Sequence, residues 1–81
     1  MLLEIISPDK KLYSGEVISL RVPGSKGSFE ILKNHAPIIS TLEKGSITIL
    51  EDNGKRSSFE IDGGVIEAKH NKIIVIAENA K

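Results

Sequence analysis

Apolar and polar residues alternate along most of the chain, in short stretches that glycine or proline interrupts. Isoleucine and valine fill these stretches, and alternation with a period of two is typical of β-strands that bury one face. No apolar pattern with the helical period of about 3.6 residues continues far enough to indicate a helix. We therefore expect strands over residues 2–6, 11–13, 16–22, 28–32, 37–41, 46–51, 57–61, 65–69 and 72–77.

The number and shortness of these strands predict the architecture. Nine or ten short strands joined mostly by tight turns, with no helical domain, favour an all-β fold of two sheets packed face to face, a sandwich. We expect Gly15 to end a strand, residues 42–45 to form a turn, and Gly63–Gly64 to bend the chain sharply between two strands. Asn53–Gly54 predicts a type I′ hairpin turn. The 81 residues make one domain, residues 1–81.

The alternation also predicts which side chains enter the core. The expected inward residues are Leu3, Ile5, Ile18, Leu20, Val22, Ile47, Ile49, Phe59, Ile61, Ile73, Val75 and Ala77, with Val17 facing outward. The same pattern leaves four apolar residues of the first and last strands on the outside: Leu2, Ile6, Ile74 and Ile76. Exposed apolar side chains that cluster on one face indicate a docking surface. The alternative is that the last strand is central and covered on both faces.

Composition narrows the function classes further. Eleven basic and eleven acidic side chains give no net charge, which argues against a nucleic-acid binder. With no cysteine, the chain has neither a disulfide framework nor a thiolate metal site. No apolar run is long enough to span a bilayer, and no signal peptide is present, so we expect no direct membrane insertion. If the protein works at a membrane, a partner holds it there.

The chain offers little catalytic chemistry. His35 and His70 lie far apart in the sequence, and neither stands at a metal-ligand spacing from another ligand. Glu51 and Asp52 are neighbours beside a turn, and alternation points them to opposite faces. The loop Gly24–Gly27 is not followed by a helix that would make it a phosphate site. We therefore expect no catalytic residue, no metal site and no cofactor, and we do not expect an enzyme.

One stretch resembles a known protein family. Residues 22–37 read VPGSKGSFEILKNHAP and are similar to the V-P-G-x-x-G-x-F-G-I-L-P-G-H-A-P segment of the epsilon subunit of F-type ATP synthases, in its N-terminal β-sandwich domain. Further matching pieces stand in the same order at residues 5–8, 12–15, 38–40, 42–45, 59, 63–65 and 71–73. The resemblance covers essentially the whole chain.

The resemblance implies a mechanical role. A member of this family is a central-stalk (rotor) subunit that binds the gamma subunit and the c-ring and couples proton-driven rotation to ATP synthesis, which other subunits catalyse. It would sit peripherally on the cytoplasmic side of the bacterial inner membrane, within the larger ATP synthase complex. The resemblance implies a loop that faces the c-ring, with the candidates Lys26, Ser28, Glu30, Lys33, Asn34 and His35. For gamma, the candidates are the exposed residues Leu2, Ile6, Ile74 and Ile76.

The chain departs from the family at several points. Glu30 stands where the family usually has glycine, and Lys33–Asn34 where it has Pro-Gly. Many members continue into a C-terminal helical hairpin that inhibits rotation, whereas this sequence stops at Lys81, so we expect neither that brake nor its nucleotide site. For His35 a purely structural role remains open, in which the ring holds the turn before Pro37 through a backbone hydrogen bond.

Two other function classes compete with the rotor hypothesis. A lipoyl- or biotinyl-type carrier domain would need a modified lysine at the tip of a protruding hairpin, and Lys44 is the one passable candidate. An oligonucleotide-binding barrel would need exposed aromatic rings for stacking. The chain has only Tyr13, Phe29 and Phe59.

Overall fold

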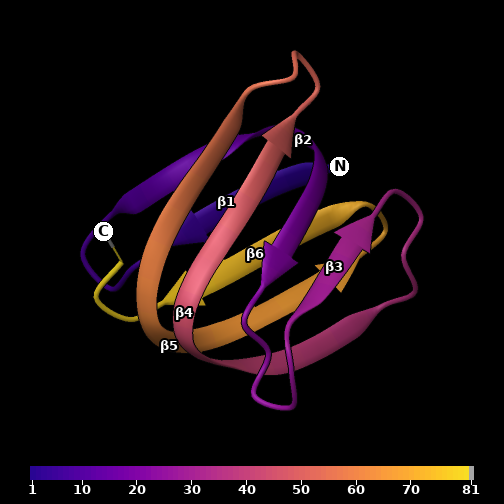
Figure 1. The fold of residues 1–81 in the computed structure, drawn as a ribbon. Helices are drawn as coiled ribbons and strands as arrows, with labels where there is room; N and C mark the ends of the chain where they lie inside the picture. Colours follow the sequence, from indigo (N-terminus) through magenta and orange to yellow (C-terminus); the bar gives the residue numbers. More distant parts are fainter. Residues whose placement is uncertain (81) are drawn as a thin grey trace.

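A computed structural model describes residues 1–80 of the chain (Figure 1). Six strands make up this part: β1 (Leu2–Ile6), β2 (Lys11–Val22), β3 (Phe29–Leu32), β4 (Ile38–Glu51), β5 (Arg56–Lys69) and β6 (Lys72–Ala77). The all-β prediction is confirmed, since the described residues contain no helix. Consequently, this part of the chain has no helix with the length and apolarity that a membrane crossing requires.

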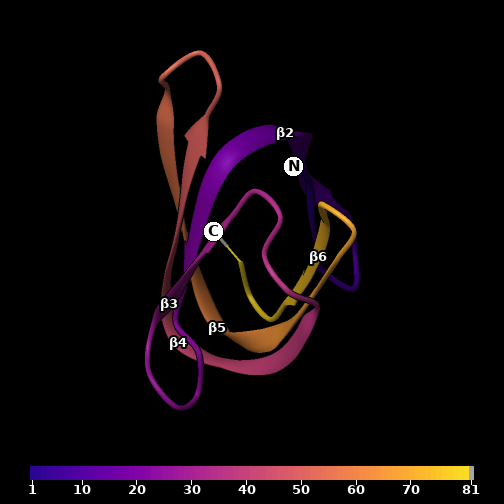
Figure 2. The ribbon, with the colours of Figure 1, turned by 90° about the vertical axis from the view of Figure 1, so that its right-hand side faces the viewer.

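The strands form one sheet that closes on itself. Its order is β1-β6-β5-β4-β2-β3, and a further pairing between β1 and β2 joins five of the strands into a ring. The pairing of β1 with β6 is parallel and the others are antiparallel. Seen from the side, the ring is a flattened barrel, with β3 added along β2 (Figure 2). The prediction of nine or ten short strands in two separate sheets is therefore wrong.

The error has one physical cause, which is glycine inside strands. Gly15, Gly45 and Gly63–Gly64 were expected to mark turns, strand ends or sharp bends, but each lies within a continuous strand of 12 or 14 residues. Glycine inside a strand often marks a bend or a bulge instead of an end. Three predicted pairs of strands therefore merge into β2, β4 and β5, and each long strand passes from one half of the flattened barrel to the other.

The bend of β5 shows why glycine is needed there. Gly64 has a φ of 155°, and a Cβ atom on it would overlap the backbone carbonyl of Ile76 in β6. On the paired strand β4, a Cβ atom on Gly45 would lie 2.9 Å from the ring of Pro23. The close approach of the Ile76 carbonyl and of the Pro23 ring therefore disfavours a side chain at the corner where β4 and β5 turn together.

The core agrees with the alternation at almost every position. Its fully or nearly buried members are Leu3, Ile5, Val17, Leu20, Val22, Ile31, Leu42, Ile47, Ile49, Ile61, Ile66, Ala68, Ile73, Val75 and Ala77. Two expectations are wrong at one place, because Val17 is 3% exposed and Ile18 is 46% exposed. The register between β2 and β4 shifts between Val17 and Ser19, so a β-bulge inserts Ile18 as an extra residue and turns its side chain outward. Phe59, expected in the core, is only half-buried.

The type I′ turn lies in a different hairpin from the one expected. At Asn53–Gly54 only Gly54 has a positive φ, of 87°, and the amide of Glu51 donates to the carbonyl of Lys55 across the three residues between them. This is a three-residue loop with glycine in the left-handed position, so the type I′ prediction is wrong. The two-residue turn between β5 and β6 instead has positive φ at both His70 (52°) and Asn71 (59°), as type I′ requires.

Candidate functional site

The outer surface over β1, β6 and the adjoining halves of β5 and β4 carries several exposed apolar side chains. Val65, Ile76 and Ile6 are direct cross-strand partners on β5, β6 and β1. Ile39 of β4 and Ile76 are the most exposed members, at 71% and 50%. We call this surface the apolar face, and its residues are Leu2, Ile6, Ile39, Val65, Ile74 and Ile76.

The predicted clustering is therefore present in the fold. All four gamma candidates, Leu2, Ile6, Ile74 and Ile76, belong to the apolar face, although Ile6 and Ile74 are half-buried. β6 is indeed a central strand between β1 and β5, but its outer side is open in the described residues. Sequence reasoning missed Ile39 and Val65, because it considered the outward residues of the terminal strands alone. Alternation within residues 37–41 and 65–69 was the signal that could have found them.

Charged side chains border the apolar residues. Glu4 and Glu67 lie on either side of Ile74 in the cross-strand register. Lys11 Nζ lies 3.0 Å from a carboxylate oxygen of Glu4, and this hydrogen bond and charge hold the pKa of Glu4 below its usual range, with a smaller contribution from Lys72. The apolar face is thus a set of exposed isoleucine, leucine and valine side chains with ionised groups between and beside them.

The six c-ring candidates do not form a single loop. Lys26 and Ser28 lie in the connection from β2 to β3, whereas Lys33, Asn34 and His35 lie in the connection from β3 to β4, at the opposite end of β3 (Figure 1). Glu30 projects from β3 itself, and all six side chains are exposed. The structure therefore distributes these candidates along the length of β3, and the expectation of one loop at one end of the sandwich is wrong.

The connection from β2 to β3 is tightly folded. The amide of Gly27 donates to the carbonyl of Gly24 at 2.9 Å, and Ser25 binds Thr41 of β4 through both its amide and its hydroxyl. A Cβ atom on Gly24 would come within 2.7 Å of both the Gly27 carbonyl and the ring of Phe29. The loop conformation thus depends on glycine at position 24 and leaves Lys26 at its exposed tip.

The connection from β3 to β4 is held by local and distant bonds. Asn34 adopts a φ of 65°, as expected for the residue in the place of the family's glycine. The amide of His35 donates to the carbonyl of Leu32 at 3.1 Å, and His35 Nδ1 lies 2.7 Å from the carbonyl of Ala36, which makes Nδ1 the protonated nitrogen. The backbone contact of His35 that the structural alternative requires is thus present, and Nε2 remains free to meet a partner.

A family model described as the β-sandwich domain of the ATP synthase delta/epsilon chain matches residues 1–81. The chain belongs to this family. It is 39% identical over 77 residues to the ATP synthase epsilon chain of Chlorobium limicola, and the alignment covers 95% of this chain and 88% of that relative. It is 44% identical over 77 residues to the epsilon chain of Leptospira borgpetersenii, of which it spans 60%. The chain thus spans 88% of the length of the first relative and 60% of the length of the second.

Solved structures share the fold of this ATP synthase family member. A chain in the Euglena gracilis mitochondrial ATP synthase, in a structure of OSCP, F1 and the c-ring, superposes with a TM-score of 0.94 at 17% identity, covering 100% of this chain and 52% of that chain. A chain of the Tetrahymena thermophila mitochondrial ATP synthase, in a structure of the central stalk and c-ring, gives 0.83 at 15% identity and covers 65% of that chain. At these identities the likeness establishes the fold.

The position of Lys44 bears on the carrier-domain alternative for this family member. Lys44 is exposed, but it lies inside β4, beside the corner at Gly45, and not at the tip of a hairpin. A prosthetic arm needs a lysine on a protruding turn, so the structure contradicts that part of the alternative. The oligonucleotide-binding alternative also lacks its stacking platform, because Tyr13, Phe29 and Phe59 are all half-buried.

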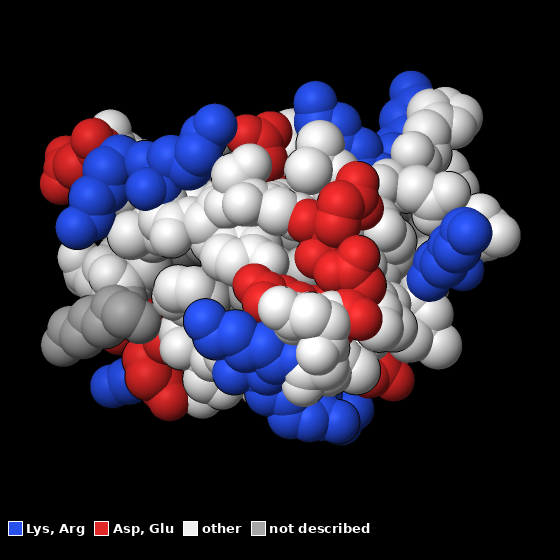
Figure 3. All heavy atoms as spheres, turned by 90° about the horizontal axis from the view of Figure 1, so that it is seen from above, with Lys and Arg blue, Asp and Glu red and all other residues white. Residues whose placement is uncertain are grey.

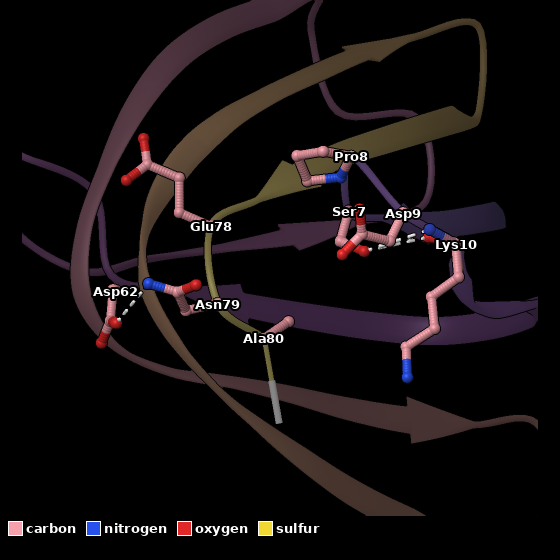
Figure 4. Close-up of a pocket in the computed structure, with 8 residues that line it drawn as sticks. All are labelled: Ser7, Pro8, Asp9, Lys10, Asp62, Glu78, Asn79 and Ala80. Atoms are coloured by element: carbon pink, nitrogen blue, oxygen red, sulfur yellow. Dashed lines mark hydrogen bonds between the residues drawn. The ribbon is translucent and has the colours of Figure 1, made fainter.

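An open recess lies at the end of the barrel where β6 ends (Figure 4). Ser7, Pro8, Asp9 and Lys10 form one side, and Asp62, Glu78, Asn79 and Ala80 form the other. Asn79 donates to a carboxylate oxygen of Asp62 at 3.0 Å, and Ser7 and Lys10 hydrogen-bond each other. Within residues 1–80, no group of three side chains of the metal-ligating types lies close enough to hold an ion. The recess is thus built from hydrogen bonds that close a turn and fix the end of β6.

Proposed function

We propose that this chain acts as the N-terminal domain of an ATP synthase epsilon chain, a non-catalytic subunit of the central stalk. It binds the gamma subunit through the apolar face and contacts the c-ring through exposed side chains along β3. It would be held peripherally on the cytoplasmic side of a bacterial inner membrane by these partners. The observation on which the proposal depends is the apolar face, in a chain that belongs to the delta/epsilon family.

The physical argument for a partner on the apolar face is the number of exposed apolar side chains that gather on it. Six apolar side chains from four adjacent strands share one surface, and single exposed apolar residues alone would need no explanation. A protein partner that covers them removes apolar area from water, which is the dominant favourable contribution to most protein–protein association. The bordering carboxylates of Glu4 and Glu67 then fix the register of the contact.

The proposed mechanism is mechanical coupling. The core consists of interlocking aliphatic side chains, and close-packed interiors deform little under load. The closed ring of five strands adds hydrogen-bonded ladders that resist shear between the halves of the barrel. Contacts on different sides of such a body transmit torque between two partners without any chemistry of its own.

The test is co-purification of the 81-residue chain with a gamma subunit and, separately, with an isolated c-ring from the same source. A Glu30→Ala, His35→Ala double variant is expected to lose ring binding and to keep gamma binding. An Ile74→Glu variant is expected to lose gamma binding alone, because it places a charge inside the apolar face. If the folded wild type binds neither partner, the proposed function is wrong.

A further inference from the structure

Two turns that are distant in the sequence form one surface at the end of the barrel near the N-terminus. The turn between β3 and β4 lies beside the hairpin between β5 and β6 (Figures 1 and 2). The amide of Asn34 donates to Asn71 Oδ1 at 2.7 Å, and Asn71 Nδ2 donates to Asn34 Oδ1 at 3.0 Å. Both residues have positive φ, so each turn presents its asparagine side chain toward the other. This pair of hydrogen bonds makes a single unit of the two turns.

The surface so formed is basic. Residues 31–37 and 68–73 contain no aspartate or glutamate. We call the joined surface the basic end, and its charged or ionisable residues are Lys33, His35, Lys69, His70 and Lys72. All five side chains are exposed. Lys69 and Lys72 line two shallow depressions. They share the first with His35 and Asn71 and the second with His70 and Glu67, so the two lysines lie between the two histidines.

The end of the molecule with the turn between β4 and β5 carries both basic and acidic groups (Figure 3). The chain as a whole has no net charge, so the basic end leaves an acidic excess elsewhere. Carboxylates border the basic end: Glu67 lies beside Lys69, Glu4 is paired mainly with Lys11, and Glu16 is paired with the N-terminal amine of Met1, which lines the same depression as His35. A basic surface on a neutral molecule orients it toward an anionic partner.

We propose that the whole basic end, and not the β3–β4 turn alone, meets carboxylate groups on the polar face of the c-ring, and that Asn71 positions the turn for this contact. The inference depends on the proposed function and extends it to Lys69, His70 and Lys72, which sequence reasoning had not singled out. Continuity with the ring-facing candidates Lys33, Asn34 and His35 favours the ring as the partner. Charge complementarity indicates acidic groups on the ring side.

The experiment measures the affinity of the chain for the isolated c-ring at several salt concentrations. Removing two basic groups in a Lys69→Gln, Lys72→Gln variant is expected to weaken binding about threefold to tenfold at low salt, as exposed ion pairs contribute modestly. The dependence of affinity on salt should become shallower, because fewer charges remain to be screened. A Lys10→Gln, Lys55→Gln variant is the matched control, since it removes the same charge from other parts of the surface and should bind like the wild type.

Asn71→Gly tests the positioning role. Glycine adopts the left-handed conformation of residue 71 without cost, so the hairpin is kept while both hydrogen bonds to Asn34 are lost. Ring affinity should fall about threefold, roughly the effect of a lost hydrogen bond, and the salt dependence should stay that of the wild type. Faster amide hydrogen exchange at Asn34 would report the released turn, independently of binding.

The outcomes separate the two proposals. If the wild type does not bind the ring, the proposed function and this inference are both wrong. If the wild type binds and the Lys69→Gln, Lys72→Gln variant binds equally well, only this inference is overturned. Vesicles with anionic phospholipid and no ring form a further arm. Equal, lysine-dependent binding to these vesicles would identify lipid phosphate as the partner and would also overturn the inference.

Discussion

The two outer faces of the barrel share two strands and differ in chemistry. On the apolar face, β4 and β5 present Ile39 and Val65. Beyond the corner at Gly45 and Gly64, the same strands together with β2 and β3 present a mainly polar face, whose residues are Arg21, Ser28, Glu30, Ser46, Thr48, Ser58 and Glu60, with Leu32 exposed two residues beyond Glu30. There, Ser46 donates to Glu60 at 2.6 Å and Arg21 donates to Ser28 at 3.3 Å.

The difference indicates which face awaits a partner. Hydroxyl and charged groups on the polar face bind one another and water, so this face stays hydrated without a partner, and the proposed ring contacts of Ser28 and Glu30 would be polar ones. Exposure of isoleucine and valine to water on the apolar face is unfavourable, and the free energy falls when another surface excludes that water. Because one pair of strands forms both faces, the corner between them is the feature that allows a single small domain to have two distinct surfaces.

The largest expected effect comes from breaking that corner. In a Gly64→Ala variant, the new methyl group would overlap the Ile76 carbonyl, so β5 and β6 must separate. We expect the variant to lose more than about 3 kcal/mol of unfolding free energy through combined strain and lost packing.

Urea denaturation followed by circular dichroism measures this loss. Gly54→Ala is the control, because Gly54 also has a positive φ but a Cβ atom there meets no atom within 4 Å. It should lose only about 1 kcal/mol, the ordinary cost of a left-handed backbone for alanine. Equal losses for the two variants would mean that the corner is not specifically crowded.

The second effect concerns the bulge of β2, which buries the side chain of Val17 and exposes that of Ile18. Val17→Ala removes two buried methyl groups and should lose about 2 kcal/mol of unfolding free energy. Ile18→Ala, at the neighbouring exposed position, should change it by less than about 0.5 kcal/mol. Simple alternation predicts the opposite order, so thermal unfolding of the two variants tests the bulge directly.

The same bulge marks the limit of what the sequence could predict about the fold. Alternation placed Leu3, Ile47 and Val75 correctly, because the core fixes which face of a strand is buried. It could not place Val17 and Ile18, because a bulge depends on the register with β4, a strand distant in sequence. Nor could it show that Gly45 bends a strand without ending it, since a turn and a bend have the same local signal.

The third effect compares the two faces in binding. Ile76→Ala shortens the central residue of the apolar face and should weaken the complex with gamma by about 1 kcal/mol, or roughly fivefold. Thr48→Ala, a matched truncation on the polar face, should leave gamma affinity within about twofold. Isothermal titration calorimetry of both variants measures the difference. A larger effect from Thr48→Ala would mean that gamma binds the polar face.

The candidate surfaces were predictable only in part. The family resemblance led to Asn34 and His35, and alternation led to Ile74 and Ile76, since both signals are local in sequence. The connection between Asn34 and Asn71 spans 37 positions and depends on the packing of two turns. No local pattern reports such a contact, so only the folded structure unites the basic end.

The smallest expected effect lies at the junction between the two halves, and it depends on pH. Tyr13 lies on the half of β2 that pairs with β1. Its hydroxyl donates a hydrogen bond of 2.8 Å to a carboxylate oxygen of Glu51, at the end of β4, and its ring contacts Phe59 of β5 edge to face. Burial, together with the hydrogen bond and charge of Glu51, raises the pKa of Tyr13 from 10.0 to about 12. The folded chain therefore holds the phenol proton more tightly than the unfolded chain does. The resulting stabilisation is complete below pH 10 and is lost as the pH rises from about 10 to about 12.

Tyr13→Phe isolates this contribution, because it removes the phenol hydroxyl and leaves every other ionisable group in place. At pH 7 the variant should be less stable by about 1 kcal/mol or somewhat less, the value of one partly exposed hydrogen bond. The difference in unfolding free energy between wild type and variant should shrink between pH 10 and pH 12, as the wild-type phenol ionises beside a carboxylate. Urea titrations at stepped pH measure it. A difference that stays constant to pH 12 would mean that the bond to Glu51 does not hold the proton, and that aromatic packing alone joins the two halves at this point.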